Sequence, residues 1–432
     1  MFVDHLPRWE QPLASSLPST NHKNQPIIVA KQALEGIILT GLLIIAVVTI
    51  FLALFAKRLS STIITPPMFF LALGVLFSFS DMLPKESAKD GLHLVAEVAL
   101  VILLFLDAAK VNLAELIRER TIPLRMLLVG LPLAIIIGAG SAGLILPNWP
   151  LFTLALLGAI LAPTDAALGQ SVISDPEVPE MERQSLSVES GLNDGLALPA
   201  VLLFASLASV SPENEGTNWL AFIVMQLTLG PLVGGVAGYV GGWIFLKADE
   251  RKFTASTYEG ISTLALAGAA YLAATLLGGN GFIAAFVAGL AFGSVVKGKC
   301  QFVYDFTESE GQLLSWTAFF LLGFTLVPEA ALSLTLPVLL VILTSLFVVR
   351  PAAIWLSLIG TGLSIRTRLF FGWFGPRGLA TALFALLIVD KHPSAEGRAI
   401  LMVAINAVWI SALLHGVSAA FGARWYGGSN ER

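Results

Sequence analysis

The chain has 432 residues, of which 56% are hydrophobic and only 12% are charged, and its mean hydropathy is +0.83. These values exclude an ordinary soluble domain and are typical of a polytopic membrane protein. The net charge of −4 and the lack of Lys/Arg runs argue against a nucleic-acid partner, because phosphate binding needs a basic face.

The first 33 residues are polar, contain several prolines and lack the apolar run of a cleavable signal peptide, so they are predicted to be an extracytoplasmic tail. Residues 34–424 form one predicted transmembrane domain, and 425–432 a short cytoplasmic tail. Apolar windows of about 20 residues, the length that crosses a bilayer, predict thirteen transmembrane helices. They fall at 34–56, 62–80, 91–109, 123–146, 151–173, 185–210, 219–246, 256–277, 280–296, 311–329, 335–360, 369–389 and 398–421.

The basic residues give these helices a direction. Of the 25 lysines and arginines, sixteen follow odd-numbered spans or lie in the C-terminal tail, and seven lie on the other side. The remaining two, Arg350 and Arg377, fall within predicted spans. Because cytoplasmic loops are enriched in Lys and Arg, the N-terminus is predicted outside and the C-terminus in the cytoplasm, which fits a plasma-membrane protein.

Two predicted spans are interrupted by proline. The fifth is broken at Ala162-Pro163-Thr164-Asp165, and the twelfth at Gly375-Pro376-Arg377-Gly378. Proline within a helix frees backbone groups that protein, water or ions must satisfy. The two spans run in opposite directions because their numbers differ by seven. Matching broken helices in opposite orientation predict an inverted-repeat transporter that works by alternating access, with its site at the midplane.

Ionisable residues cluster near these interruptions. The sixth span holds Glu189, Ser190, Asn193 and Asp194, in two pairs spaced four residues apart. Charged groups at membrane depth are costly and usually mark an ion path. Asp194, Ser190 and the backbone near Thr164 offer the hard oxygen ligands that a small cation prefers. One carboxylate can hold a proton or a metal ion, so the two are predicted to compete for Asp194.

Arg377 in the twelfth span would be an unpaired buried charge without an acid partner, and we predict that this partner is Glu189. Arg350, which precedes Pro351, is interpreted as a packing or snorkelling residue. The alternative for Glu189 and Arg377 is a purely structural ion pair. Thr164 could equally cap a broken helix, and Asp107 could be an entrance residue or a local partner of Lys110.

Three motifs in this order resemble the NhaP-type sodium/proton antiporters of the monovalent cation/proton antiporter superfamily. They are Pro163-Thr164-Asp165, then Glu189-Ser-x-x-Asn193-Asp194-Gly195, then Gly375-Pro376-Arg377-Gly378, in the fifth, sixth and twelfth of thirteen spans. The similarity extends over about residues 34–424 and includes Leu104-Phe-Leu-Asp107-Ala.

The resemblance implies that Asp194 carries the ion and the proton, while Ser190, Glu189 and the Thr164 main chain help to bind sodium. It also implies that Asp165 sits beside Asn193 and that Arg377 ties Glu189. Asn193 stands where the electrogenic branch has an aspartate, so the resemblance implies electroneutral one-for-one exchange. It further implies a homodimer with a moving core bundle and a role in pH homeostasis.

Other functions remain open at this point. The same machine could exchange potassium or lithium, because residue types do not fix cavity size. A cation channel could share the acids. An intramembrane enzyme would need a catalytic motif that the chain lacks. No cofactor is expected beyond the transported cation, and the partners are the cation, the proton and the lipid bilayer. Gly230, Gly234, Gly238 and Gly242 predict close helix packing, either within the protomer or at a dimer contact.

Overall fold

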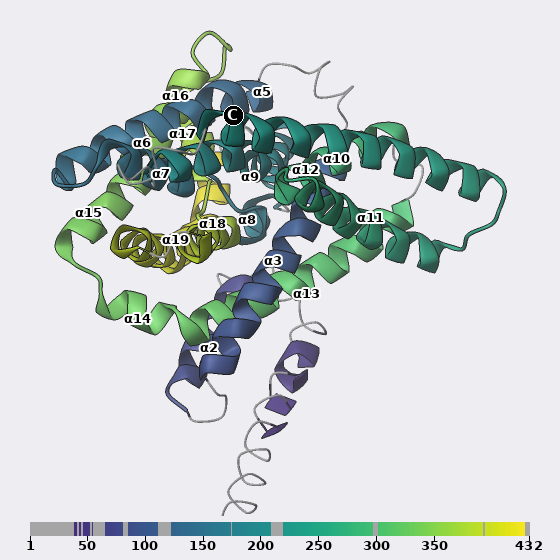
Figure 1. The fold of residues 1–432 in the computed structure, drawn as a ribbon. Helices are drawn as coiled ribbons and strands as arrows, with labels where there is room; N and C mark the ends of the chain where they lie inside the picture. Colours follow the sequence, from purple (N-terminus) through teal and green to yellow (C-terminus); the bar gives the residue numbers. More distant parts are fainter. Residues whose placement is uncertain are drawn as a thin grey trace, which may run out of the picture.

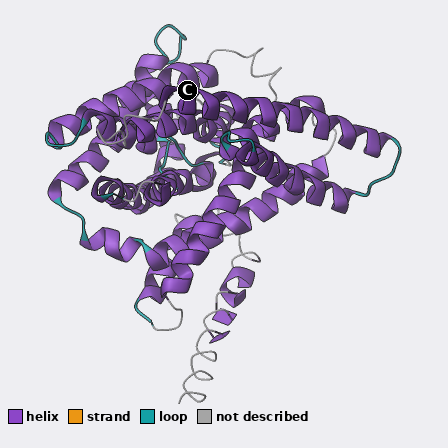
Figure 2. Cartoon of the chain, viewed as in Figure 1, coloured by secondary structure: helices purple, strands orange, loops and turns teal. Residues whose placement is uncertain are grey.

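A computed structural model describes residues 65–80, 85–110, 122–173, 175–208, 219–296, 301–391 and 394–427, together with single positions between 39 and 54. The regular elements within these ranges are all helical, joined by turns and short loops (Figures 1 and 2). The predicted first span and both predicted tails lie largely outside the described residues.

The helices form one continuous series along the chain. Their bounds are α2 Pro66–Ser78, α3 Lys85–Lys110, α5 Ile122–Arg125, α6 Leu131–Ile145, α7 Leu151–Leu161, α8 Ala166–Ile173, α9 Glu180–Ala208, α10 Trp219–Glu250, α11 Ser256–Leu276, α12 Gly281–Val296, α13 Gln301–Thr325, α14 Val327–Leu332, α15 Leu336–Thr344, α16 Arg350–Ser357, α17 Ile365–Trp373, α18 Leu379–Lys391 and α19 Ala395–Gly427. Two π-helical turns, η2 Met126–Gly130 and η4 Ser345–Val349, link α5 to α6 and α15 to α16.

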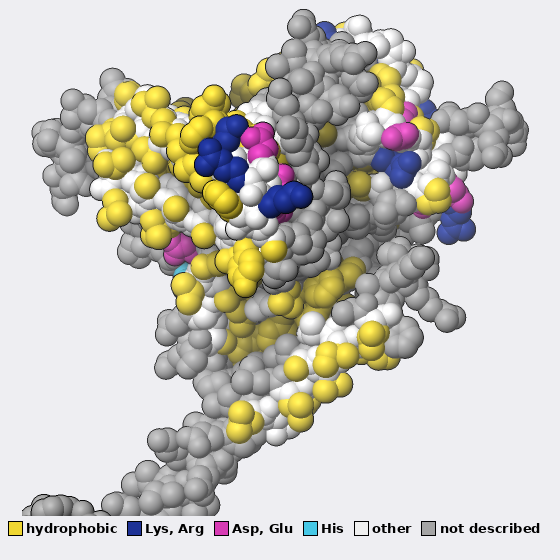
Figure 3. Space-filling model, turned by 90° about the vertical axis from the view of Figure 1, so that its right-hand side faces the viewer, with side chains coloured by type: hydrophobic (Ala, Val, Ile, Leu, Met, Phe, Trp, Pro, Cys, Tyr) yellow, Lys and Arg dark blue, Asp and Glu magenta, His cyan; other side chains and the backbone are white. Residues whose placement is uncertain are grey.

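Seven helical segments of the described part are long and apolar enough to cross a membrane. Five shorter apolar helices accompany them, Pro66–Ser78, Leu151–Leu161, Gly281–Val296, Gly311–Thr325 and Leu379–Val389. Large apolar side chains are exposed on many helices, for example Leu144 at 87% and Leu276 at 86%. The face in Figure 3 is dominated by such side chains, and charged groups gather in a few places. Such a surface suits lipid, because the hydrocarbon core offers no partner for charge.

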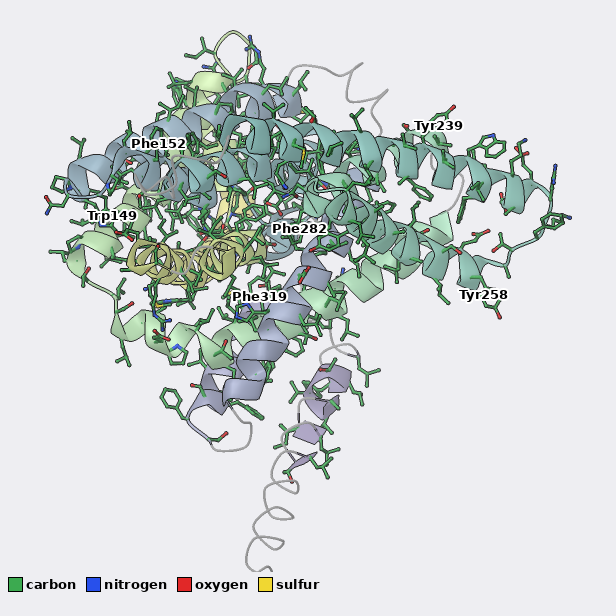
Figure 4. All side chains as sticks on the ribbon, in the orientation of Figure 1. Trp149, Phe152, Tyr239, Tyr258, Phe282 and Phe319 are labelled. Atoms are coloured by element: carbon green, nitrogen blue, oxygen red, sulfur yellow. The ribbon has the colours of Figure 1, made fainter. Side chains whose placement is uncertain are left out.

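The interior is packed from apolar and aromatic side chains that the helices turn inward. Phe319 of α13 is fully buried and Phe282 of α12 is 4% exposed, and both lie among the helices in Figure 4. Tyr239 of α10 and Tyr258 of α11 point away from them and are more than half exposed. The buried core is therefore shared between helices, and the outer faces are left for the bilayer.

Glycines allow several helices to approach at backbone distance. A Cβ atom on Gly234 would lie 2.2 Å from the carbonyl oxygen of Ala284, and one on Gly238 would lie 2.1 Å from that of Ala288. The glycine face of α10 therefore packs against α12 of the same protomer, the first of the two readings that the sequence left open.

One order of elements occurs twice. A helix, a π turn and a second helix with proline in its first turn precede each broken helix, as α5–η2–α6 before α7/α8 and α15–η4–α16 before α17/α18. The second helices carry Pro132 and Pro351. π turns inside helices commonly mark functional regions, since they disturb the regular hydrogen-bond ladder.

The start of α9 is fixed by the end of α19. The Tyr426 hydroxyl donates to Glu182 Oε1 at 2.6 Å and shares a hydrogen bond of 2.9 Å with Thr367 Oγ1 of α17. Burial, reinforced by the Glu182 hydrogen bond, raises the pKa of Tyr426 to about 12, so the phenol keeps its proton. This contact holds the helix that carries the acid cluster in a defined position.

Candidate functional site

The two broken helices cross where each is interrupted. Helix α7 ends at Leu161 and α8 begins at Ala166, while α17 ends at Trp373 and α18 begins at Leu379. The amide nitrogen of Asp165 donates to the carbonyl oxygen of Pro376 at 2.8 Å, which joins the two irregular stretches directly. Four helix ends therefore meet in a small volume, where free amides and carbonyls need partners.

Asp165 satisfies the amino ends of two helices at once. Its Oδ1 atom accepts from the amide of Leu168 at 3.1 Å, which caps α8. Its Oδ2 atom accepts from the amide of Leu379 at 2.8 Å, the first residue of α18. A carboxylate is favourable at a helix N-terminus because it accepts from unpaired N–H groups and opposes the positive end of the helix dipole. Asp165 is thus primarily a structural clamp on the crossing.

Arg377 plays the opposite role at the carboxyl end of α7. Its Nη1 atom donates to the carbonyl oxygens of Ala162 at 2.9 Å and Pro163 at 3.1 Å, and its amide donates to Ser411 Oγ at 2.7 Å. The side chain is fully buried. A cation near freed carbonyls complements the negative end of the helix dipole.

Glu189 is paired with Arg350, and the predicted pair between Glu189 and Arg377 is wrong. Arg350 Nη1 lies 3.0 Å from Glu189 Oε1 and Nη2 lies 3.1 Å from Oε2, with both side chains only 4% exposed. Arg350 Nη2 also donates to the carbonyl oxygen of Phe374 at 3.3 Å, just after α17 ends. A Cβ atom on Gly375 would lie 1.7 Å from Arg350 Nε, so glycine makes room for the guanidinium. Arg350 is therefore part of the crossing and is not merely a packing residue.

Thr164 lies at the centre of a buried polar network. Its Oγ1 atom donates to Glu189 Oε2 at 3.2 Å, lies 3.0 Å from Ser190 Oγ, and accepts from Asn193 Nδ2 at 2.5 Å. Asn193 Nδ2 also donates to Glu189 Oε1 at 3.3 Å. The crossing and α9 thus bring together Thr164, Glu189, Ser190 and Asn193. The sequence pointed to the main chain of Thr164, whereas its hydroxyl makes these contacts.

Asp194 is the next residue along α9 and stands outside that network. Its side chain is partly buried, and its Oδ1 atom has no hydrogen-bond partner among the described residues. The acids near enough to influence it electrostatically are Asp165, Asp107 and Glu189. A Cβ atom on Gly191 would lie 3.4 Å from the Cβ of Asp107, which places that α3 residue against α9. Asp194 is therefore a buried oxygen ligand that is free to take a proton or a cation.

Asp107 is the residue whose place the sequence left undecided. Its apolar context, Leu104-Phe-Leu-Asp107-Ala, resembled the family, but local spacing could not show that α3 packs on α9 at this level. Among the described residues no group of three or more His, Cys, Asp or Glu side chains could hold a metal ion. The oxygens near Asp194 are instead a mixture of carboxylates and hydroxyls.

The model of the family described as "Sodium/hydrogen exchanger, transmembrane" matches residues 43–425. This chain belongs to the sodium/hydrogen exchanger family. Members of the family are cation/proton antiporters rather than enzymes, so this exchanger is not an intramembrane enzyme. The matched region includes both broken helices and α9, where the polar network is found.

Individual relatives and solved structures agree with this membership. The exchanger is 28% identical to the K(+)/H(+) antiporter NhaP of Alkalimonas amylolytica over 91% of this chain and 67% of that protein. It is 27% identical to the K(+)/H(+) antiporter NhaP2 of Shewanella sp. (strain ANA-3), over 88% and 65%. The chain thus spans about two thirds of the length of these curated relatives.

The fold matches the sodium proton antiporter MjNhaP1 from Methanocaldococcus jannaschii at pH 8, with a TM-score of 0.73 and 22% identity over 93% of this chain and 99% of that chain. At that identity the likeness concerns the fold alone. It agrees with the helical architecture of this exchanger in Figure 1.

The crossing of this exchanger leaves no room for a side chain at Gly378. A Cβ atom there would lie 1.8 Å from Asp165 Oδ2. We expect Gly378→Ala to lose about 2 kcal/mol or more of stability, because the carboxylate must leave the amide of Leu379. Thermal unfolding of the purified variant in detergent measures this loss.

The matched control is Gly268→Ala in α11, where an added Cβ meets nothing within 4 Å. Its unfolding temperature should equal that of the parent protein. Equal unfolding temperatures for the Gly378 and Gly268 variants would contradict the role of Asp165 as a clamp.

Proposed function

We propose that this exchanger carries sodium, or lithium, across the membrane in exchange for a proton, and that the two ions compete for the carboxylate of Asp194. The observation that carries the proposal is the position of Asp194 Oδ1, buried and without a hydrogen-bond partner among the described residues, one residue along α9 from the Thr164 network. A carboxylate that is not committed to a protein partner can release a proton and accept a cation.

Sodium would take its remaining ligands from neighbouring oxygens. Ser190 Oγ and Thr164 Oγ1 lie 3.0 Å apart and are the nearest neutral donors of lone pairs on α9 and at the crossing. Glu189 already accepts hydrogen bonds from Arg350, Thr164 and Asn193, so its main role is to hold these groups in place. Asp165 and Arg377 support the site by fixing the helix ends.

Exchange is proposed to be electroneutral. Asn193 donates from its amide nitrogen to Thr164 Oγ1 and Glu189 Oε1, and as an amide it cannot carry a titrating charge. One carboxylate that swaps one proton for one monovalent cation moves no net charge. The initial rate in proteoliposomes should therefore be unchanged when potassium and valinomycin clamp the membrane potential at different values. A rate that follows the potential would mean that a second acid, such as Asp165 or Asp107, also titrates.

The transmembrane arrangement is proposed to comprise thirteen spans in two inverted repeats, with the interrupted spans five and twelve at the midplane. The seven long helices and five short apolar ones fall within the predicted second to thirteenth windows, which supports this count. The repeated order of helix, π turn and broken helix supports the repeat. We further propose alternating access, a homodimer, a plasma-membrane location with the N-terminus outside, and a role in pH homeostasis.

Potassium is the second candidate cation. The curated relatives from Alkalimonas and Shewanella bear the name K(+)/H(+) antiporter, whereas the matching archaeal structure is of a sodium proton antiporter. Cations of different size require different ligand distances, so the same oxygens can serve either ion if the cavity differs slightly.

One assay separates these candidates. Purified protein is reconstituted in vesicles with an acidic interior and a pH-sensitive dye, and sodium, lithium and potassium are added in turn across a range of pH. We expect dequenching with sodium and lithium. Dequenching with potassium alone would select the second candidate. Cation flux that carries current without moving protons would instead indicate a channel, and no response to any cation would refute exchange.

A further inference from the structure

A small cavity lies beside the crossing, on the side formed by α6, α7 and α15 with η4. Its volume is about 10 Å³, measured as the space open to the centre of a water-sized sphere, which is enough for roughly one small particle. The wall is mostly apolar, with Ala134 and Gly138 of α6 and Leu157 of α7 among its residues. Its polar side chains are Ser141, Ser345 and Arg377.

Arg377 brings unused hydrogen-bond donors to this cavity. Its Nη1 atom is committed to the carbonyl oxygens of Ala162 and Pro163. Its Nε and Nη2 atoms are buried and have no acceptor among the described residues. Together these two nitrogens carry three N–H bonds, and Nε and Nη2 form one edge of the planar guanidinium, the edge that commonly grips an anion.

The charge of Arg377 also lacks a direct counter-ion. The acid predicted to neutralise it, Glu189, is bound on both oxygens by Arg350, and Arg377 has no ion pair within the described ranges. Arg350 lies near enough to repel Arg377 electrostatically. A buried positive charge without a partner is costly, so a negative ion on the unused edge would be strongly favoured.

The occupant must be small and must accept hydrogen bonds. The cavity is too small for a carboxylate or a phosphate group, which leaves a single-atom anion or a water molecule. A water molecule accepting from Arg377 would also need two acceptors for its own hydrogens. The wall offers two serine hydroxyls, and Ser141 Oγ already donates to the carbonyl oxygen of Gly138 at 3.0 Å. An anion needs no acceptor, and it balances the charge.

We propose that this cavity binds one monovalent halide-type anion, held by the Nε and Nη2 edge of Arg377. The anion would remain in the protein as a fixed counter-charge next to the crossing and would not be transported. The proposal concerns binding to the purified protein, so its outcome does not depend on whether the chain exchanges sodium, potassium or no cation.

A pair of glycines one turn apart on α6 gives a matched test. Gly138 lines the cavity, and an added Cβ would meet Gly158 and Val349 at 3.5 and 3.6 Å, which is ordinary contact. Gly140 is exposed, and an added Cβ there meets nothing within 4 Å. Both changes to alanine raise helix propensity equally, but only Gly138→Ala places a methyl group at the cavity wall.

Thermal unfolding of the whole chain in detergent is measured at constant sodium and ionic strength while chloride replaces gluconate. We expect the unfolding temperature of the parent protein and of Gly140→Ala to rise by about 2 °C at saturating chloride, because a ligand of the folded state stabilises it. Gly138→Ala should lose at least about half of this shift. Identical curves in chloride and gluconate, or an undiminished shift in Gly138→Ala, would overturn the proposal.

The position of the ion is tested without any variant. Crystals of the parent protein grown in bromide should show an anomalous scattering peak in the cavity, within hydrogen-bond distance of Arg377. Density in the cavity without an anomalous signal would mean an ordered water molecule only and would equally overturn the proposal.

Discussion

Asp194→Asn is expected to reduce cation/proton exchange to the level of protein-free vesicles while the protein remains folded. Asparagine has nearly the same shape as aspartate, but it neither binds a proton nor attracts a cation as a carboxylate does. Since Asp194 Oδ1 has no hydrogen-bond partner among the described residues, the change breaks no described contact. Dye dequenching in proteoliposomes measures exchange, and thermal unfolding in detergent reports the fold.

The control for this variant is Glu180→Gln, which makes the same chemical change in the first turn of α9. Glu180 is exposed, and its only described side-chain contact is the hydrogen bond that Gln184 donates. It should exchange at the rate of the parent protein. Substantial exchange by the Asp194 variant would remove this residue from the transport cycle.

Arg350→Gln is expected to destabilise the protein by about 3–5 kcal/mol, because it leaves the buried carboxylate of Glu189 without its cation. It also removes the donor to the carbonyl oxygen of Phe374. The loss should appear as a large fall in unfolding temperature. A second change, Glu189→Gln in the Arg350→Gln background, should recover part of it, because the uncompensated charge is gone.

The surface ion pair between Arg398 and Glu329 provides the comparison. Its side chains are 59% and 40% exposed, against 4% for each partner of the buried pair. Exposed pairs contribute roughly 0–1 kcal/mol, so Arg398→Gln should hardly change the unfolding temperature. Similar effects for both arginine variants would contradict the assignment of Arg350 as the partner of Glu189.

The sequence was sufficient to locate the crossing because its signals are local. Pro163 and Pro376 each interrupt an apolar run, and the structure has non-helical stretches at both positions. The spacing of Glu189, Ser190 and Asn193 likewise placed them on neighbouring faces of one helix. Three of these side chains meet Thr164 because α9 packs against the break that follows α7.

The pairing of charges could not be predicted in the same way. The choice of Glu189 for Arg377 assumed that a buried arginine needs an acid, but the broken helix supplies carbonyl oxygens that satisfy one end of the guanidinium. Arg350 is 161 positions away from Glu189 and begins α16 after a π turn. No periodicity of the sequence reports such a contact, which depends on how two distant helices pack.

The central claim is that a proton and a cation exclude one another at Asp194, and proton release on cation binding tests it most directly. Sodium is added to the purified protein in weakly buffered solution, and the released protons are counted with a pH indicator. We expect about one proton per sodium ion bound, released from the parent protein and absent from Asp194→Asn. Sodium binding without proton release, or equal release from the variant, would contradict the account.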